Sequence, residues 1–182
     1  QRISEIEAMG APAFGMDVDA AGLVTLSKMG REVYPKNPTE IREICGKTEL
    51  PFIVKGIMTV EEAEAAVSAG AAGIVVSNHG GRVLDSSQAT VEVLPSIADA
   101  VGNSCTVLVD GGVRQGTDIF KMLALGADAV LIGRPIAIAA IGGGIEAVKE
   151  ECIRLRNELL HSMIMTGTES IASISRTSLI TS

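Results

Sequence analysis

The sequence predicts an α/β protein with a parallel sheet, and more specifically part of a (β/α)8 TIM barrel. Five short apolar segments, near residues 13, 52, 73, 106 and 129, alternate with helical segments, as is typical of a parallel sheet covered by helices. Polar side chains follow the five segments, namely Asp19, Lys55, His79, Asp110 and Arg134. A barrel would bring these strand ends to one mouth, where active sites are found, whereas an open doubly wound sheet would spread them along an edge.

The length sets the extent of this barrel. The chain has 182 residues, enough for one core, whereas a complete barrel typically needs about 250 residues. We therefore expect residues 1–182 to form a single partial TIM-barrel domain that supplies strands 4 to 8, without the first three strands. Open sheet edges need a cover, so we expect a homo-oligomer or association with a missing N-terminal segment.

Composition excludes several classes of protein. The net charge of −7 argues against a nucleic-acid surface, which needs a basic stripe. The weakly polar run 135–148 is too short to span a bilayer, and no signal segment opens the chain. Cys45, Cys105 and Cys152 form no CxxC or metal pattern, so we expect reduced thiols, no metal and a cytoplasmic location.

The first elements follow from apolar spacing and turn residues. Ile3, Ile6 and their neighbours predict a short helix that ends at Gly10, and residues 13–19 predict a strand that ends in carboxylates. Residues 20–38 predict a loop that can hold one helical turn. A helix begins at Pro38 and presents Ile41, Ile44 and Cys45 as its apolar face.

The middle of the chain repeats the pattern twice. Residues 51–57 predict a strand that carries Lys55, and Thr59 with Glu62 predicts a capping box for a helix that ends at Gly70. Residues 73–77 predict a buried strand, and a helix follows over residues 90–101.

Two further units complete the series. Strands are expected at 105–109 and 129–132, with a helix at 116–126 between them. A long helix is expected over 144–166, in which His161 has a packing or surface position. The tail offers Ile171, Ile174 and Leu179 as docking contacts.

The strongest chemical signal follows the third strand. Ser77, Asn78, His79, Gly80, Gly81 and Arg82 come directly after the apolar run 74–76. A neutral imidazole can take a proton near pH 7, and a guanidinium suits a carboxylate. His79 and Arg82 therefore suggest proton removal from a small carboxylic acid, with a satisfied histidine in a tight loop as the alternative.

Two glycine turns suggest a phosphate site. Asp110, Gly111, Gly112 and Arg114 precede a helix start, whose N–H groups can bind an anion. Gly133 and Arg134 follow the next strand, and barrel phosphate sites commonly lie after strands seven and eight. The alternative is a pair of ordinary glycine-rich turns.

Three charged residues complete the candidate site. A lysine at the end of a buried strand needs an anionic partner, and for Lys55 a salt bridge to Asp19 or Asp110 is one explanation. Asp19 is expected to orient His79 and stabilise its protonated form, as a triad carboxylate does. Asp17 could cap the next helix or act in the same way as Asp19.

Taken together, the motifs resemble the FMN-dependent α-hydroxy-acid oxidases and dehydrogenases, such as glycolate oxidase and lactate oxidase. The resemblance rests on VKGIMTVEEAEAAVSAGAAGIVVSNHGGRVLD (residues 54–85), DGGVRQGTD (110–118) and ADAVLIGRP (127–135). It implies a barrel that binds FMN at its mouth and oxidises a small L-2-hydroxy acid to the 2-keto acid.

The resemblance also implies individual residues. His79 would be the base, paired with Asp19, and Arg82 would bind the substrate carboxylate. Lys55 and Ser77 would face the flavin. The ribityl chain and phosphate would lie against Asp110, Gly111, Gly112, Arg114, Gly133 and Arg134.

The chain departs from the family in places. Asp17 and Ala21 replace a threonine and a proline in the segment around Asp19, and Arg31 is the candidate for a second carboxylate-binding arginine. Two other interpretations therefore stay open. One is a related FMN barrel similar to type 2 isopentenyl diphosphate isomerase, and the other is a non-catalytic barrel fragment that needs a partner segment.

Overall fold

The computed structural model describes residues 2–30 and 33–179. Helices and strands alternate along almost the whole of this part. In order the elements are α1 (Arg2–Ala8), β1 (Phe14–Asp17), the 3-10 turn η1 (Asp19–Gly22), α2 (Val24–Lys28), α3 (Pro38–Cys45), β2 (Phe52–Ile57), α4 (Val60–Ser68), β3 (Gly73–Val76), α5 (Thr90–Val101), β4 (Thr106–Val109), α6 (Gly116–Ala124), β5 (Ala129–Val130), α7 (Arg134–Met165), η2 (Ile171–Ser173) and η3 (Arg176–Ser178).

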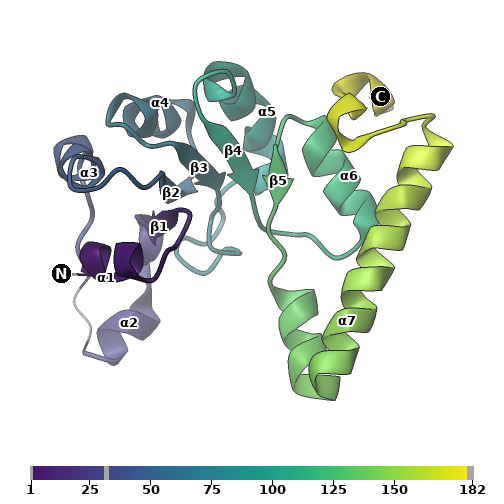
Figure 1. Ribbon diagram of the computed structural model, residues 1–182, viewed down its shortest axis with the longest axis horizontal. Coiled ribbons are helices and arrows are strands. Elements are labelled where there is room, and N and C mark those ends of the chain that lie inside the picture. Colours follow the sequence, from purple (N-terminus) through teal and green to yellow (C-terminus); the bar gives the residue numbers. More distant parts are fainter. Residues whose placement is uncertain (1, 31–32, 180–182) are drawn as a thin grey trace.

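The five strands pair in parallel in the order β1-β2-β3-β4-β5. Each new strand is thus added on the same side of the one before it. Because crossovers between parallel strands are nearly always right-handed, this order places the connecting helices on one face, and α3 to α6 follow one another around the outside of the strands (Figure 1). The arrangement is an arc of a barrel, since a doubly wound sheet would reverse its direction and carry helices on both faces.

The core lies between the strands and this row of helices. All four residues of β3 are buried, because the strand has two paired neighbours and both of its faces are covered. Val54, Val107 and Val109 from the adjoining strands pack with Leu94 and Ile97 of α5, and each of these side chains is at most 2% exposed. Burial of β-branched side chains therefore fixes the strands whose ends carry the polar groups.

Capping side chains start two of the helices. The Thr59 hydroxyl accepts the Glu62 N–H, and the Glu62 carboxylate accepts the Thr59 N–H, which confirms the predicted capping box. The helix predicted from Pro38 is also confirmed, and Asn37 forms a second capping box with Glu40.

Two sequence expectations were wrong. The loop over residues 20–38 holds two short helical pieces, η1 and α2. The last long helix starts at Arg134 rather than Gly144, and Gly144, with φ 63° and ψ −147°, breaks it into two parts. The sequence does not reveal the first part, because after Arg134 it holds only apolar residues, proline and glycine. Ile138 and Ile141 in it are 71% and 89% exposed, so it lacks the apolar–polar alternation that marks a surface helix.

The second part of α7 packs along α6 (Figure 1). Gly116 makes this close approach possible, since a Cβ there would lie 2.3 Å from both Leu155 O and Leu159 N. In the tail, Ile174 is buried and Leu179 packs against the same cluster, as predicted, whereas Ile171 is exposed and the prediction for it was wrong. His161 lies on the surface of α7.

A bidentate ion pair anchors the tail. The Arg176 guanidinium donates to both carboxylate oxygens of Asp99, at 2.9 and 2.7 Å, and to the carbonyl of Pro95 at 3.1 Å. These hydrogen bonds hold the pKa of Asp99 below its usual value.

The three cysteines are free thiols, as expected. Burial raises the pKa of the Cys45 and Cys105 thiols, which disfavours the reactive thiolate at both positions. Within the part of the chain that the structure describes, no helix is long and apolar enough to cross a membrane.

The contact at Gly116 gives a stability prediction. Gly116→Ala should force α6 and α7 apart and lower the free energy of unfolding by about 3 kcal/mol, because backbone atoms cannot move aside as a flexible side chain can. Urea unfolding measures the change. Gly142→Ala is the matched control, since nothing lies within 4 Å of its Cβ position, and it should leave stability within about 1 kcal/mol of the parent. Equal stability of the two variants would contradict the close packing of α6 on α7.

Candidate active site

A cavity of about 480 Å³ lies at the C-terminal ends of the strands. It collects nine of the eleven site residues that the sequence predicts, and Asp19 and Ser77 are the two that do not line it. The lining residues are Lys55, His79, Gly80, Arg82, Asp110, Gly111, Gly112, Val113, Arg114, Leu131, Gly133, Arg134 and Ala137.

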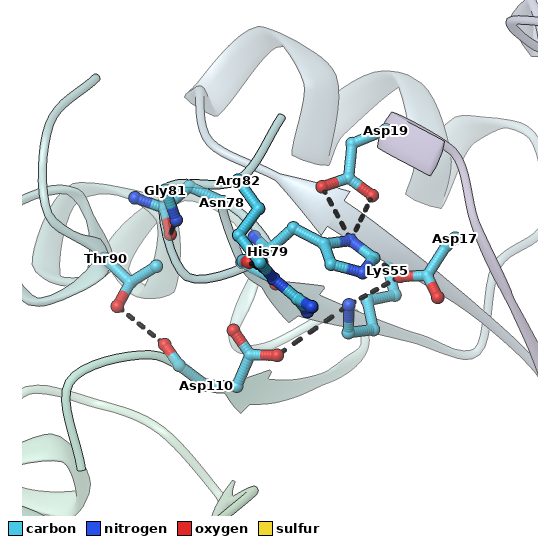
Figure 2. Close-up of polar contacts among 10 residues, drawn as sticks. Asp17, Asp19, Lys55, Asn78, His79, Gly81, Arg82, Thr90 and Asp110 are labelled. Atoms are coloured by element: carbon cyan, nitrogen blue, oxygen red, sulfur yellow. Dashed lines mark hydrogen bonds and ion pairs between the residues drawn. The ribbon is translucent and has the colours of Figure 1, made fainter. Parts of the chain in front are cut away.

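His79 and Asp19 form a close pair (Figure 2). The His79 Nδ1 atom lies 3.2 and 3.3 Å from the two carboxylate oxygens of Asp19, and both side chains are largely buried, at 15% and 14% exposed. A proton on Nδ1 satisfies this contact, which leaves Nε2 as the basic ring atom. The satisfied-histidine alternative accounts for the Nδ1 contact alone and gives no reason for the cationic cavity that the ring borders.

Hydrogen bonds within the loop hold His79 in place. Its φ of 56° is unusual for a residue other than glycine. The buried Ser77 hydroxyl accepts the His79 N–H at 3.2 Å, and Arg82 Nε donates to the His79 carbonyl at 2.9 Å. Asn78 closes the turn, since its side-chain oxygen accepts the Gly81 N–H at 3.2 Å. Ser77 therefore supports the backbone of the base, and its expected contact with the flavin stays a prediction.

Lys55 lies between two carboxylates. Its Nζ is 2.5 Å from Asp17 Oδ1 and 3.7 Å from Asp110 Oδ2. The expected partner Asp110 is confirmed, whereas the other expected partner, Asp19, is replaced by Asp17. Asp17 does not cap the following turn, because Val18 occupies the N-cap position of η1, so its capping alternative was wrong.

Gly56 is a site residue that the sequence reasoning missed. It has a φ of 102°, and the register of β2 against β3 shifts at this point. A Cβ on Gly56 would lie 2.7 Å from Asp19 Cγ and Oδ1. Only glycine therefore leaves room for the carboxylate that orients His79, and the signal in the sequence was a glycine directly after the strand lysine.

The helix start expected to bind phosphate is already occupied. The Asp118 carboxylate accepts the N–H groups of Arg114 and Gln115 at 2.9 and 3.0 Å, and the Glu158 carboxylate from α7 accepts the Gly116 N–H at 2.8 Å. The expectation that the N-terminus of α6 adds to a phosphate cradle was therefore wrong.

The start of α7 is the better anion site. It has no acidic residue in its first turn, and Gly133 at its N-cap makes no side-chain capping bond. Arg134 stands at this helix start, and Arg114 lines the same cavity. A helix N-terminus beside two guanidinium groups suits a phosphate.

Asp110 carries an unsatisfied acceptor. Its Oδ1 atom is buried and, among the described residues, has no hydrogen-bond partner. The Thr90 hydroxyl donates to the Asp110 carbonyl at 2.6 Å and fixes the turn, in which Gly111 and Gly112 have φ of 92° and 74°. A buried acceptor without a partner is costly, so it suits a hydroxyl donor from a ligand.

One cluster has the composition of a cation site. Ligand atoms of Asp17, Asp19 and His79 lie within 4.8 Å of one another. Lys55 Nζ lies against Asp17 and supplies the positive charge that a cation would otherwise bring, so the cluster does not call for a metal.

Comparison with known proteins places this site in a family. The model of the FMN-dependent dehydrogenase family matches residues 3–181. The chain belongs to this family. A peroxisomal (S)-2-hydroxyacid oxidase of Arabidopsis thaliana is 53% identical over 129 residues, which cover 71% of this chain and 36% of that protein. An L-lactate oxidase of Lactobacillus jensenii is 41% identical over 166 residues, which cover 91% and 39%.

Solved structures confirm the fold class. A mandelate oxidase variant with (S)-mandelic acid superposes with a TM-score of 0.88 at 37% identity, over 96% of this chain and 57% of that one. The five strands are therefore part of a (β/α)8 barrel, as predicted. The chain spans between 36% and 41% of the length of the first curated relatives it matches.

The residues present fit FMN. Arg114, Arg134 and the start of α7 suit its phosphate, and the orphaned Asp110 Oδ1 suits a ribityl hydroxyl. Lys55 suits the electron-rich edge of the ring system. Arg31, the candidate for a second carboxylate-binding arginine, lies outside the described residues.

The space at Gly56 gives a second prediction. Gly56→Ala should push Asp19 away from His79 and lower turnover about 100-fold, since misplacing a catalytic group by about 1 Å has an effect of this size. Steady-state kinetics with L-lactate, the substrate in the name of one relative, test this expectation.

Gly70→Ala is the matched control for that variant. Gly70 has the same φ of 102°, but its nearest contact is the Cys45 Cβ at 3.3 Å, away from the cavity. Both variants should lose about 1–2 kcal/mol of stability from left-handed strain, and only Gly56→Ala should lose turnover. Equal turnover in the two variants would show that the Asp19 position does not matter.

Proposed function

We propose that this chain supplies the cofactor and substrate site of an FMN-dependent 2-hydroxy-acid oxidase or dehydrogenase, which converts a small L-2-hydroxy acid to the 2-keto acid. The observation that carries the proposal is the His79–Asp19 pair, at 3.2 Å, beside Arg82 on a cavity that Lys55, Arg114 and Arg134 also line. The names of the relatives, an (S)-2-hydroxyacid oxidase and an L-lactate oxidase among them, support the substrate class.

Arg82 binds the substrate carboxylate. Its Nε is used in the bond to the His79 carbonyl, which leaves the terminal N–H groups of the guanidinium to form a charge-assisted pair with a carboxylate. Because the same bond ties Arg82 to the base, the substrate acid group and the base are held at a fixed separation.

His79 accepts the proton that the substrate loses as its Cα is oxidised. The proton goes to Nε2, because Nδ1 faces Asp19. The Asp19 carboxylate then stabilises the imidazolium, as the triad carboxylate does in hydrolases. Both side chains are largely buried, which strengthens their interaction relative to water.

FMN, when bound, supplies the two-electron acceptor for this oxidation. The residues that hold it are Arg114, Gly133 and Arg134 at the phosphate, Asp110, Gly111 and Gly112 along the ribityl chain, and Lys55 at the ring system. This assignment is preferred to an activity like type 2 isopentenyl diphosphate isomerase, because that reaction gives no reason for a base next to a carboxylate-binding arginine.

The site works within a complete barrel. In the described part of the chain β1 and β5 each have one paired neighbour, and the apolar first part of α7 is exposed. We expect this partial-barrel domain, residues 1–182, to associate with the remaining three βα units or with further copies of itself. A non-catalytic fragment is the alternative, and it predicts no FMN binding even with that partner. The cytoplasmic location stays a prediction, and two relatives are named as peroxisomal.

The base gives the central test. His79→Asn should slow flavin reduction by L-lactate or glycolate without oxygen at least about 100-fold, the usual worth of a general base. Stopped-flow absorbance of the flavin band measures the rate. His161→Asn, on the exposed face of α7, is the matched control, and its flavin should be reduced at the parent rate. Unchanged reduction in His79→Asn would rule out this base.

The phosphate site gives a separate test. Arg134→Met should weaken FMN binding about 10- to 100-fold, because it removes one charge-assisted contact. Titration of the apoprotein with FMN, followed by flavin fluorescence, measures the affinity. Arg156→Met removes an exposed cation of α7 and should bind FMN like the parent. Equally weakened FMN binding in both variants would show that the effect comes from net charge and not from a contact between Arg134 and the phosphate.

A further inference from the structure

The carboxylate at the end of β1 is not used in the proposed reaction. We infer that Asp17 is a positioning residue for Lys55. It fixes the ammonium group at the edge of the cavity and offsets its charge, and so weakens the preference of the site for reduced over oxidised FMN. The inference rests on the proposed function, because it concerns the cofactor of that same site.

The contacts single out Lys55 as the partner of Asp17. Asp17 and Lys55 are directly paired in the register of β1 against β2, and Asp17 Oδ1 lies 2.5 Å from Lys55 Nζ. The same oxygen is 3.9 Å from His79 Nδ1, which already has Asp19 at 3.2 Å. Asp17 therefore acts first on the lysine and only weakly on the base.

The charges around Lys55 are unbalanced. Asp17 and Asp110 both face the one ammonium group, at 2.5 and 3.7 Å. Lys55 is 22% exposed and Asp17 37% exposed, so water screens their interaction only in part. Two carboxylates against one ammonium leave less positive potential in the cavity than a lysine with Asp110 alone.

The potential in the cavity bears on the cofactor. Reduced FMN carries more negative charge on its ring system than oxidised FMN, and charge near the ring nitrogens tunes the electronics of a flavin. A lysine whose charge is offset stabilises the reduced form less. The ion pair also orders a long side chain that would otherwise sample several rotamers, so that Lys55 Nζ has one position at the edge of the site.

The test compares four forms of the full-length holoprotein in a double-mutant cycle: the parent, Asp17→Asn, Lys55→Met and the double variant. Asp17→Asn keeps the shape of the side chain and removes its charge. It should raise the preference for reduced over oxidised FMN about tenfold, which is about 30 mV in the midpoint potential of a two-electron couple. In the Lys55→Met background the same change should have a clearly smaller effect, because it then removes only the direct charge of Asp17 and no longer changes the position or the ion pairing of Lys55.

Dye-coupled potentiometry measures the midpoint potential without any hydroxy acid. Glu43→Gln removes an exposed charge on α3 and should leave the potential unchanged, because distant surface charges are screened. An unchanged potential in Asp17→Asn, or the same shift with and without Lys55, would overturn the inference. If the protein binds FMN but no hydroxy acid bleaches the flavin band, the proposed function is overturned. The inference about Asp17 is still decided by the midpoint potentials, which are measured without any hydroxy acid.

Discussion

The parallel pairing of β1 to β5 in sequence order is the constraint on which the candidate site depends. Asp17, Lys55, Ser77 and Asp110 each lie at or just after the end of a different strand, and neighbouring strands hold them side by side. None of them is near another in sequence. Burial of the strand interiors fixes this register, since a slip of one residue would move the buried side chains to the wrong face. The packing of the core is therefore what brings His79, Lys55 and Asp110 to one cavity and places Asp17 against Lys55.

The site solves an electrostatic problem for an acidic chain. The net charge of −7 does not attract anions over long distances, so both anionic groups of the proposed chemistry depend on local cations. Arg82, Arg114 and Arg134 all line the cavity and supply these cations. The carboxylates nearby are mostly satisfied by partners: Asp19 by His79, Asp17 by Lys55, and Asp118 by two backbone N–H groups. The exception is the buried Asp110 Oδ1, which has no hydrogen-bond partner among the described residues. A ligand that donates a hydrogen bond there would satisfy it.

Glycines at three positions allow segments of the chain to approach one another closely or to change direction. Gly56 admits the Asp19 carboxylate, Gly116 admits the backbone of α7, and Gly144 ends the first part of that helix. The second part of α7 then reaches back along α6, where Glu158 caps the start of that helix. Because this cap occupies the start of α6, the uncapped start of α7 is left as the anion site. Glycine therefore permits close packing at Gly56 and Gly116, and it permits a change of helix direction at Gly144.

The sequence by itself determined the strands, most helices and the motif residues, because these depend on local signals. Apolar runs, the Thr59–Glu62 capping box and the polar residues after each strand are all read within a few positions. Only the tertiary structure decided that Lys55 pairs with Asp17, which is 38 residues away, and that Glu158 caps Gly116, which is 42 residues away. It also decided that α7 begins at Arg134, since an exposed apolar helix has no periodicity that reveals it. The reason is the same in each case: these features depend on which distant segments meet, and short-range patterns do not contain that information.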